Sequence, residues 1–282
     1  SLNQTEKELI LHYKHKIKYL NLEVKNMFFV LNKQKIYTYL LSVLTVIILL
    51  FIGSSTIKNE ESIETSANTN KLLPIYSVQT EKKDIALTIN CAWNDTDIDQ
   101  ILQTLKANNV KATFFVVGDW VEKYPEAVKK INESGNEIGS HSDTHAHVNQ
   151  LSYEKNVEEI KQSSEKIKKI TGKEVTLYRP PYGEYNNTVI RAANENGYIP
   201  IQWSLDTLDY TGLNGNEMWN RIKDKLSSGD IILMHNGTEH TAESLDTIIK
   251  NIKEKGFNLV TISDLIYKEN YHIDVNGKQI QN

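Results

Sequence analysis

The sequence predicts an α/β protein, an irregular (β/α)7 barrel preceded by a single transmembrane helix. Strand-like apolar runs alternate with helix-like periods from residue 84 to residue 268. Upstream, residues 36–57 form a largely apolar segment with no charged side chain. Seven strand–helix repeats imply parallel strands with right-handed crossovers, and their number suits a closed or nearly closed barrel better than an open sheet.

Residues 36–57 predict a membrane anchor. A helix of about 20 apolar residues crosses the hydrocarbon core of a bilayer. Lysines precede this segment and glutamates follow it, so the positive-inside rule puts residues 1–35 in the cytoplasm and the main part outside the cell membrane. The alternative is a cleaved signal peptide, but no clear Ala-x-Ala site follows the apolar run, which favours an uncleaved single-pass anchor.

The flanking segments are expected to lack a core of their own. The chain begins at Ser1, whereas Met27 opens a typical basic leader, so residues 1–26 are read as an upstream extension or a short cytoplasmic tail. Residues 58–83 are rich in Ser, Thr, Asn and Glu, which predicts a flexible stalk. Residues 269–282 are expected to form a C-terminal tail.

Charge and cysteine content exclude some functions. Residues 1–58 carry eight lysines and three glutamates, a net charge of +5, so the remainder carries −9 of the total of −4. An acidic main part argues against a nucleic-acid partner, because such surfaces are basic. The single cysteine, Cys91, excludes an intrachain disulfide.

The elements follow in regular order. Runs rich in β-branched and aromatic residues mark the strands, and several of the helices stop at a glycine. The expected strands are 85–89, 111–117, 136–139, 175–178, 199–203, 231–234 and 257–261. The expected helices are 97–109, one ending at residue 133, 152–170, 187–196, 217–226 and 241–255.

Reactive side chains follow five of the expected strands. In a parallel barrel the residues just after each strand gather at one rim, which predicts a shared active site. His141 and His145 are four residues apart, a spacing that places both rings on one side of a helical turn, and histidine is a common metal ligand. His147 is expected to be solvated, because the two-histidine motif is complete without it. The five groups are Asn90-Cys91-Ala92-Trp93, residues 141–145, Arg179-Pro180-Pro181-Tyr182-Gly183, residues 203–210, and His235-Asn236-Gly237.

These motifs resemble those of a known family. His141-Ser142-Asp143-Thr144-His145, Arg179-Pro180-Pro181-Tyr182-Gly183 and Leu233-Met234-His235, in this order, resemble polysaccharide deacetylases of the NodB-homology type, carbohydrate esterase family 4. The resemblance covers about residues 84–266. The strand-one motif with Trp93 also resembles the sporulation-associated branch. The implied activity is metal-assisted hydrolysis of the N-acetyl group of an amino sugar, with the glycan of the cell wall as the expected substrate.

The resemblance also implies a role for each motif residue. His141 and His145 would hold a divalent metal, with zinc the expected ion, which activates a water. His235 would act as general acid, kept protonated by Asp209. The backbone N–H of Tyr182 would stabilise the oxyanion.

Four further residues receive supporting roles. Arg179 would orient the side chain at position 90 by hydrogen bonding. Pro181 would fix the turn that carries the Tyr182 amide. Tyr210 would form a wall of the sugar groove, and Leu233 would line the acetyl pocket.

The first motif departs from the family. Asn90 and Cys91 stand where the family has two aspartates, a general base and a metal ligand. Asn90 cannot accept a proton from water, and general-base catalysis contributes roughly 10²- to 10⁴-fold. Cys91 is either a third zinc ligand or a small buried hydrophobe. The sequence therefore favours an active but slowed deacetylase, with a non-catalytic glycan-binding or wall-organising protein as the alternative.

Overall fold

The computed structural model describes residues 4–26, 37 and 71–282, in two units that are taken separately here. The first contains helix α1 (Gln4–Asn26). The expected transmembrane segment, apart from Tyr37, and residues 58–70 of the expected stalk lie outside the described residues. Among the helices that are described, none is both long and apolar enough to cross a membrane. The anchor at residues 36–57 therefore remains a prediction.

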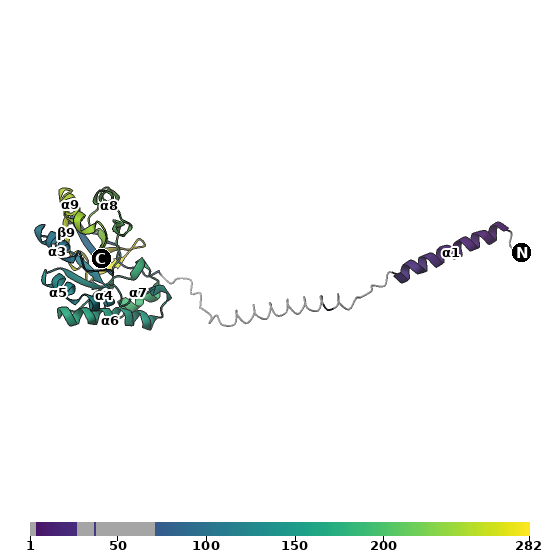
Figure 1. Ribbon diagram of the computed structural model, residues 1–282, viewed down its shortest axis with the longest axis horizontal. Helices are drawn as coiled ribbons and strands as arrows, with labels where there is room; N and C mark the ends of the chain where they lie inside the picture. The colour runs from purple at the N-terminus through teal and green to yellow at the C-terminus, as the bar shows by residue number, and fades with distance from the viewer. Residues whose placement is uncertain (1–3, 27–36, 38–70) are drawn as a thin grey trace. The chain divides into compact units, whose positions relative to one another are not determined.

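A parallel sheet forms the centre of the second unit (Figure 1). The strand order is β6-β5-β4-β3-β2-β8-β7, and β9 also pairs with β2. No pairing joins β6 to β7 in the described part of the chain, so the sheet is a half-barrel and not a closed barrel. The strands are β2 (Asp84–Cys91), β3 (Thr113–Val116), β4 (Glu137–Ser140), β5 (Leu177–Tyr178), β6 (Ile199–Pro200), β7 (Leu205–Asp206), β8 (Ile231–His235) and β9 (Asn258–Val260).

The helices agree with the expected ones in order, but one is split, the helix expected at 217–226 lies at Gly215–Ile222, and the short helix Ile262–Leu265 was not expected. The helix expected to end at residue 133 is two helices, because Pro125 starts a helix well but cannot continue one. The 19-residue helix α6 is preceded by the N-cap Ser152, whose side chain accepts a hydrogen bond from the Lys155 N–H, and is followed by the C-cap Gly172 in the left-handed conformation. The helices are α3 (Ile98–Ala107), α4 (Gly118–Lys123), α5 (Pro125–Glu133), α6 (Tyr153–Thr171), α7 (Asn187–Asn194), α8 (Gly215–Ile222), α9 (Thr241–Glu254) and α10 (Ile262–Leu265).

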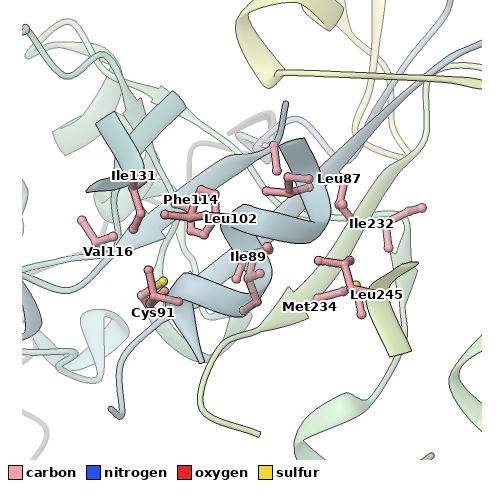
Figure 2. Close-up of a cluster of buried hydrophobic side chains, with 14 of the residues drawn as sticks. Leu87, Ile89, Cys91, Leu102, Phe114, Val116, Ile131, Ile232, Met234 and Leu245 are labelled. Carbon is pink, nitrogen blue, oxygen red and sulfur yellow. The ribbon is translucent and has the colours of Figure 1, made fainter. Parts of the chain in front are cut away.

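Alternation along β2 separates core from site. Successive side chains of a strand point to opposite faces. The odd positions of β2, from Ile85 to Cys91, pack in one apolar cluster with β3, β8 and the helices α3, α5 and α9 (Figure 2). The even positions, Ala86, Thr88 and Asn90, face the inside of the half-barrel. The two faces meet different partners, and only the inner one carries polar groups.

A second sheet corrects the expected stalk and tail. β1 (Ser77–Val78) pairs in parallel with β11 (Lys278–Gln281), which pairs antiparallel with β10 (Tyr271–Ile273). Ile75 and Val78 are completely buried. Residues 71–83 thus belong to the folded unit, as do residues 271–281, because each segment provides the pairing partner that the other lacks.

Candidate active site

The register of the strands places the motif residues side by side at one end of the parallel sheet. Val116 of β3 pairs with Cys91 of β2 and with Ser140 of β4, and Ser140 pairs with Tyr178 of β5. The next residues along β4 and β5 are His141 and Arg179, which therefore lie side by side. On the other edge of β2, Asn90 pairs with His235. Four of the expected site residues are in this way placed by the sheet itself.

These strand ends surround a cavity of about 480 Å³. Seven of the sequence-predicted residues line it, and Arg179 and Asp209 lie directly behind two of them. The lining also includes Trp93, Trp203 and Asp206, which the sequence places among the five groups at the rim but without a specific role. The predicted residues that line the cavity are Asn90, His141, His145, Tyr182, Tyr210, Leu233 and His235.

His235 is held by a buried carboxylate. Asp209 is 1% exposed, and its Oδ1 lies 2.9 Å from Nδ1 of His235. The backbone N–H of His235 and the hydroxyl of Thr241 both donate to Oδ2, at 2.6 and 2.7 Å. Because the carboxylate accepts from Nδ1, the ring presents Nε2 to a ligand. This is the arrangement expected of a general acid that is oriented by an anion. The sequence did not indicate a role for Thr241, because it lies at the start of α9 and outside the motifs.

Aromatic rings flank His235 on two sides. The ring centroid of Trp93 lies 5.5 Å from that of His235, and Tyr210 lies 5.2 Å away, nearly perpendicular. Both aromatic side chains are 49% exposed. Exposed aromatic faces beside a polar group suit the apolar faces of sugar rings. Tyr210 lines the cavity beside His235, and its role as a wall of a sugar groove stays a prediction.

Arg179 is completely buried below the cavity. Its NH1 donates to Thr88 Oγ1 and to Asn90 Oδ1, both at 2.9 Å, and its NH2 donates to the carbonyl of Gln202 at 3.1 Å. The guanidinium stacks 4.1 Å from the ring centroid of Phe115. Burial lowers the pKa of Arg179 to about 9. The sequence prediction that Arg179 orients residue 90 agrees with this contact.

The two histidines of the motif are neighbours. The ring centroids of His141 and His145 are 4.9 Å apart. Burial, followed by the proximity of His145, lowers the pKa of His141 well below its usual value. Burial and the nearby His235 also lower the pKa of His145. Both rings are therefore neutral near pH 7, which leaves nitrogen lone pairs available.

Tyr182 lies between two histidine rings. His145 contacts it edge-on at 4.5 Å, and His147 stacks on it at 4.4 Å, with its Nδ1 2.8 Å from Glu184 Oε1. Tyr182 has φ = 57°, in the left-handed region that is strained for a side-chain-bearing residue. His147 is thus not merely solvated: its stacking supports a strained residue of the site. Only the proximity of the two loops, which the sequence did not reveal, could have shown this.

Besides Arg179 and Asp209, which lie behind the lining, two predicted residues do not line the cavity. Cys91 is completely buried in the apolar cluster that packs on the helices (Figure 2). The reason is that β2 continues through residue 91, so alternation turns Cys91 away from Asn90. Pro181 is also buried, and its neighbours Tyr182 and Gly183 line the cavity instead. Cys91 therefore takes the hydrophobic alternative considered from the sequence.

Comparison with known proteins decides the family. Residues 77–201 match the model of the polysaccharide deacetylase family. The peptidoglycan-N-acetylglucosamine deacetylase of Bacillus cereus is 31% identical over 67% of this chain and 70% of its own length. The chain belongs to the polysaccharide deacetylase family. Members of this family are hydrolases acting on carbon–nitrogen bonds other than peptide bonds, and they are generally metal-dependent.

Two further proteins similar to this polysaccharide deacetylase differ in whether an activity is named for them. The uncharacterized protein YlxY of Bacillus subtilis is 35% identical over 68% of this chain, a match that spans 60% of YlxY. The structure of BA3943 from Bacillus anthracis, described as a CE4 family pseudoenzyme, has a TM-score of 0.67 and 32% identity, covering 74% of this chain and 73% of that one. The similarity thus extends to relatives with and without a named activity.

The donor set of this polysaccharide deacetylase is incomplete for a metal. Catalytic zinc is usually held by three protein ligands. His141 and His145 line the cavity, but Cys91 does not, and Asn90 offers an amide in place of a carboxylate. In the described ranges, no group of three His, Cys, Asp or Glu side chains is arranged to hold a metal ion. The residues therefore do not fit the metal centre that the family implies.

Proposed function

We propose that this protein binds an N-acetylated amino sugar of cell-wall glycan and hydrolyses its N-acetyl group slowly. The observation that carries the proposal is His235, held by Asp209 and Thr241 and flanked by Trp93 and Tyr210. The relatives named as peptidoglycan deacetylases support the choice of substrate class. The predicted membrane anchor at residues 36–57 would place the site on the outer side of the cell membrane.

The cavity provides the parts of such a reaction that this chain keeps. Leu233, which is 2% exposed, and Trp203 both line the cavity and offer an apolar surface to the acetyl methyl group. His235 would hold a proton for the departing amine, which must leave as a protonated group. The general base is missing, because the amide of Asn90 cannot accept a proton from water. We therefore expect turnover at least roughly 10²- to 10⁴-fold below that of a homologue with an aspartate at this position, because this factor counts the general base alone and not the missing metal ligand.

Asn90 also supports a second function, glycan binding without turnover. The aromatic groove and the acetyl surface are intact, while the base is absent. A protein with this site would recognise N-acetylated glycan and organise or mark the wall. The pseudoenzyme description of BA3943 is consistent with such a member of the family.

Acetate release distinguishes the two functions. Purified protein is incubated with N-acetylglucosamine oligomers and peptidoglycan fragments, and acetate is followed by NMR alongside oligomer binding by calorimetry. The proposal predicts slow acetate release that falls by about 10²-fold or more in His235→Ala, with binding retained. Binding without acetate from the wild type would establish the second function. Absence of both would contradict both.

A further inference from the structure

Arg179, Asn90 and His141 form a closed cycle of hydrogen bonds. The Arg179 side chain donates to Asn90 Oδ1 at 2.9 Å, and Asn90 Nδ2 lies 3.2 Å from His141 Nε2. His141 Nδ1 lies 2.7 Å from the backbone carbonyl of Arg179. The cycle starts and ends on the same residue.

The direction of every bond in this cycle is determined by chemistry. A carbonyl only accepts, so Nδ1 of His141 carries the proton and Nε2 carries the lone pair. A guanidinium only donates, so the oxygen of the Asn90 amide must face Arg179. The NH₂ group of Asn90 therefore points at the lone pair of His141. A flipped amide would set N–H against N–H.

The cycle is buried as well as satisfied. Asn90 is 4% exposed, His141 is 2% exposed and Arg179 is 0% exposed. The Oγ1 atom of Thr88, which accepts from Arg179, donates in turn to the carbonyl of Ile232 at 2.6 Å. Opening a satisfied, buried network leaves donors without partners, which is costly.

We propose that the Asn90 carboxamide takes the place of a metal ion at His141, so that this site is complete without a divalent cation and binds one weakly. A metal on Nε2 of His141 needs the same lone pair that Asn90 occupies. The third ligand is also missing, since Cys91 lies in the apolar cluster. The chain has thus exchanged a metal centre for an internal hydrogen-bond donor.

An aspartate at position 90 would present an acceptor to His141 in place of the amide donor. One carboxylate oxygen would keep the contact with Arg179, and the other would face the lone pair of His141 Nε2. Two acceptors face each other stably only with a proton or a metal ion between them, so a metal ion on Nε2 would be favoured where Asn90 now opposes it. Asn90→Asp is therefore expected to raise zinc affinity by about 10- to 100-fold or more, the range seen when groups around a metal ligand are changed.

Zinc binding by the intact chain tests the proposal. Wild type, Asn90→Asp and Cys91→Ala are titrated with Zn²⁺ in competition with a chromophoric chelator, and metal content after dialysis is measured by mass spectrometry. We expect substoichiometric zinc in the wild type, tighter binding in Asn90→Asp, and no change in Cys91→Ala. Stoichiometric zinc in the wild type at the affinity of Asn90→Asp, or its loss in Cys91→Ala, would overturn the proposal.

A second measurement keeps the test decisive if Asn90→Asp does not fold. Nitrogen-15 spectra of the wild-type histidines should show His141 protonated at Nδ1, and its Nε2 signal should not move with one equivalent of Zn²⁺. Displacement of that signal at stoichiometric zinc would refute the role of Asn90. Both readouts are independent of glycan turnover, so a failure here differs from a failure of the proposed function.

Discussion

Because Asn90 is neutral, the buried guanidinium of Arg179 has no carboxylate partner among the described residues. No carboxylate lies within 4.0 Å of its guanidinium in the described part of the chain. Its charge is met by Thr88, Asn90 and the Gln202 carbonyl, together with the face of Phe115. Such a buried cation is tolerated because its fork of donors is nearly satisfied and its plane is stacked.

Replacing this arginine by lysine should destabilise the protein. Arg179→Lys keeps the charge but cannot reach Thr88, Asn90 and Gln202 together or stack on Phe115. We expect the free energy of unfolding to fall by about 2–4 kcal/mol, because buried acceptors lose their donors. Chemical denaturation measures it.

The matched control is an exposed arginine. Arg191 on α7 forms a surface pair with Glu195 at 2.9 Å, and its side chain is 58% exposed. Arg191→Lys should leave the free energy of unfolding nearly unchanged, because an exposed pair contributes little. Equal effects of the two substitutions would show that the Arg179 network contributes little.

At the scale of elements, α6 holds the histidine loop. Glu159 Oε2 accepts from the Ser142 hydroxyl at 2.5 Å and from the N–H groups of Asp143 and Thr144 at 3.0 and 2.9 Å. This loop contains two residues in the left-handed region, Ser142 at φ = 71° and His145 at φ = 58°. One carboxylate thus stabilises a strained backbone that carries both histidines.

Glu159 predicts a dependence on acid. Burial alone would raise its pKa, but hydrogen bonds from Ser142 and Thr144 outweigh burial and lower it. A carboxyl whose pKa is lowered by folding stabilises the protein above its unfolded value of 4.5, and this contribution is lost as the pH falls through the folded pKa. Glu159→Ala should reduce the free energy of unfolding by about 2–4 kcal/mol at pH 7.

Denaturation at several pH values checks this prediction. The difference between wild type and Glu159→Ala should shrink below pH 4.5, and Glu159→Gln, which keeps one carbonyl for the loop, should lose less than Glu159→Ala. Glu158, an exposed neighbour paired with Lys155, provides the control, Glu158→Ala. A difference that is independent of pH would argue against the carboxylate as the stabilising group.

Elements also explain what the sequence could predict of the site. Apolar periodicity located β2 and β8, and the motif residues at their ends, Asn90 and His235, do line one cavity. The sequence predicts that the first strand ends at residue 89, whereas β2 continues through Cys91. Because side chains alternate along these two additional strand residues, Asn90 faces the site and Cys91 does not. Contacts between loops, such as His147 with Tyr182, leave no periodic trace.

At the scale of the whole molecule, short strands were missed for a similar reason. β1 and β7 have two residues each, too few for alternation to show. β1 follows a polar stretch that predicts a stalk, and its partner β11 lies about 200 residues later. Such pairing depends on tertiary contact and not on local composition.

The folded unit has more than one cavity, and chemistry separates them. A larger one, of about 860 Å³, lies between residues 71–75, α7 and the β10–β11 hairpin. Its lining lacks the flanked histidine and buried carboxylate that distinguish the cavity at the strand ends. The sugar is therefore assigned to the smaller cavity, where His235, Trp93 and Tyr210 converge.

The position of the acetyl group tests this assignment most directly. Nuclear Overhauser effects are measured between the acetyl methyl protons of an N-acetylglucosamine oligomer and the labelled protein. The account predicts contacts from the acetyl methyl to the Leu233 methyl groups and the Trp203 ring, which should be lost when Leu233 is replaced by Asn. Contacts to the residues around Ile273, in the larger cavity, or to neither cavity would contradict it.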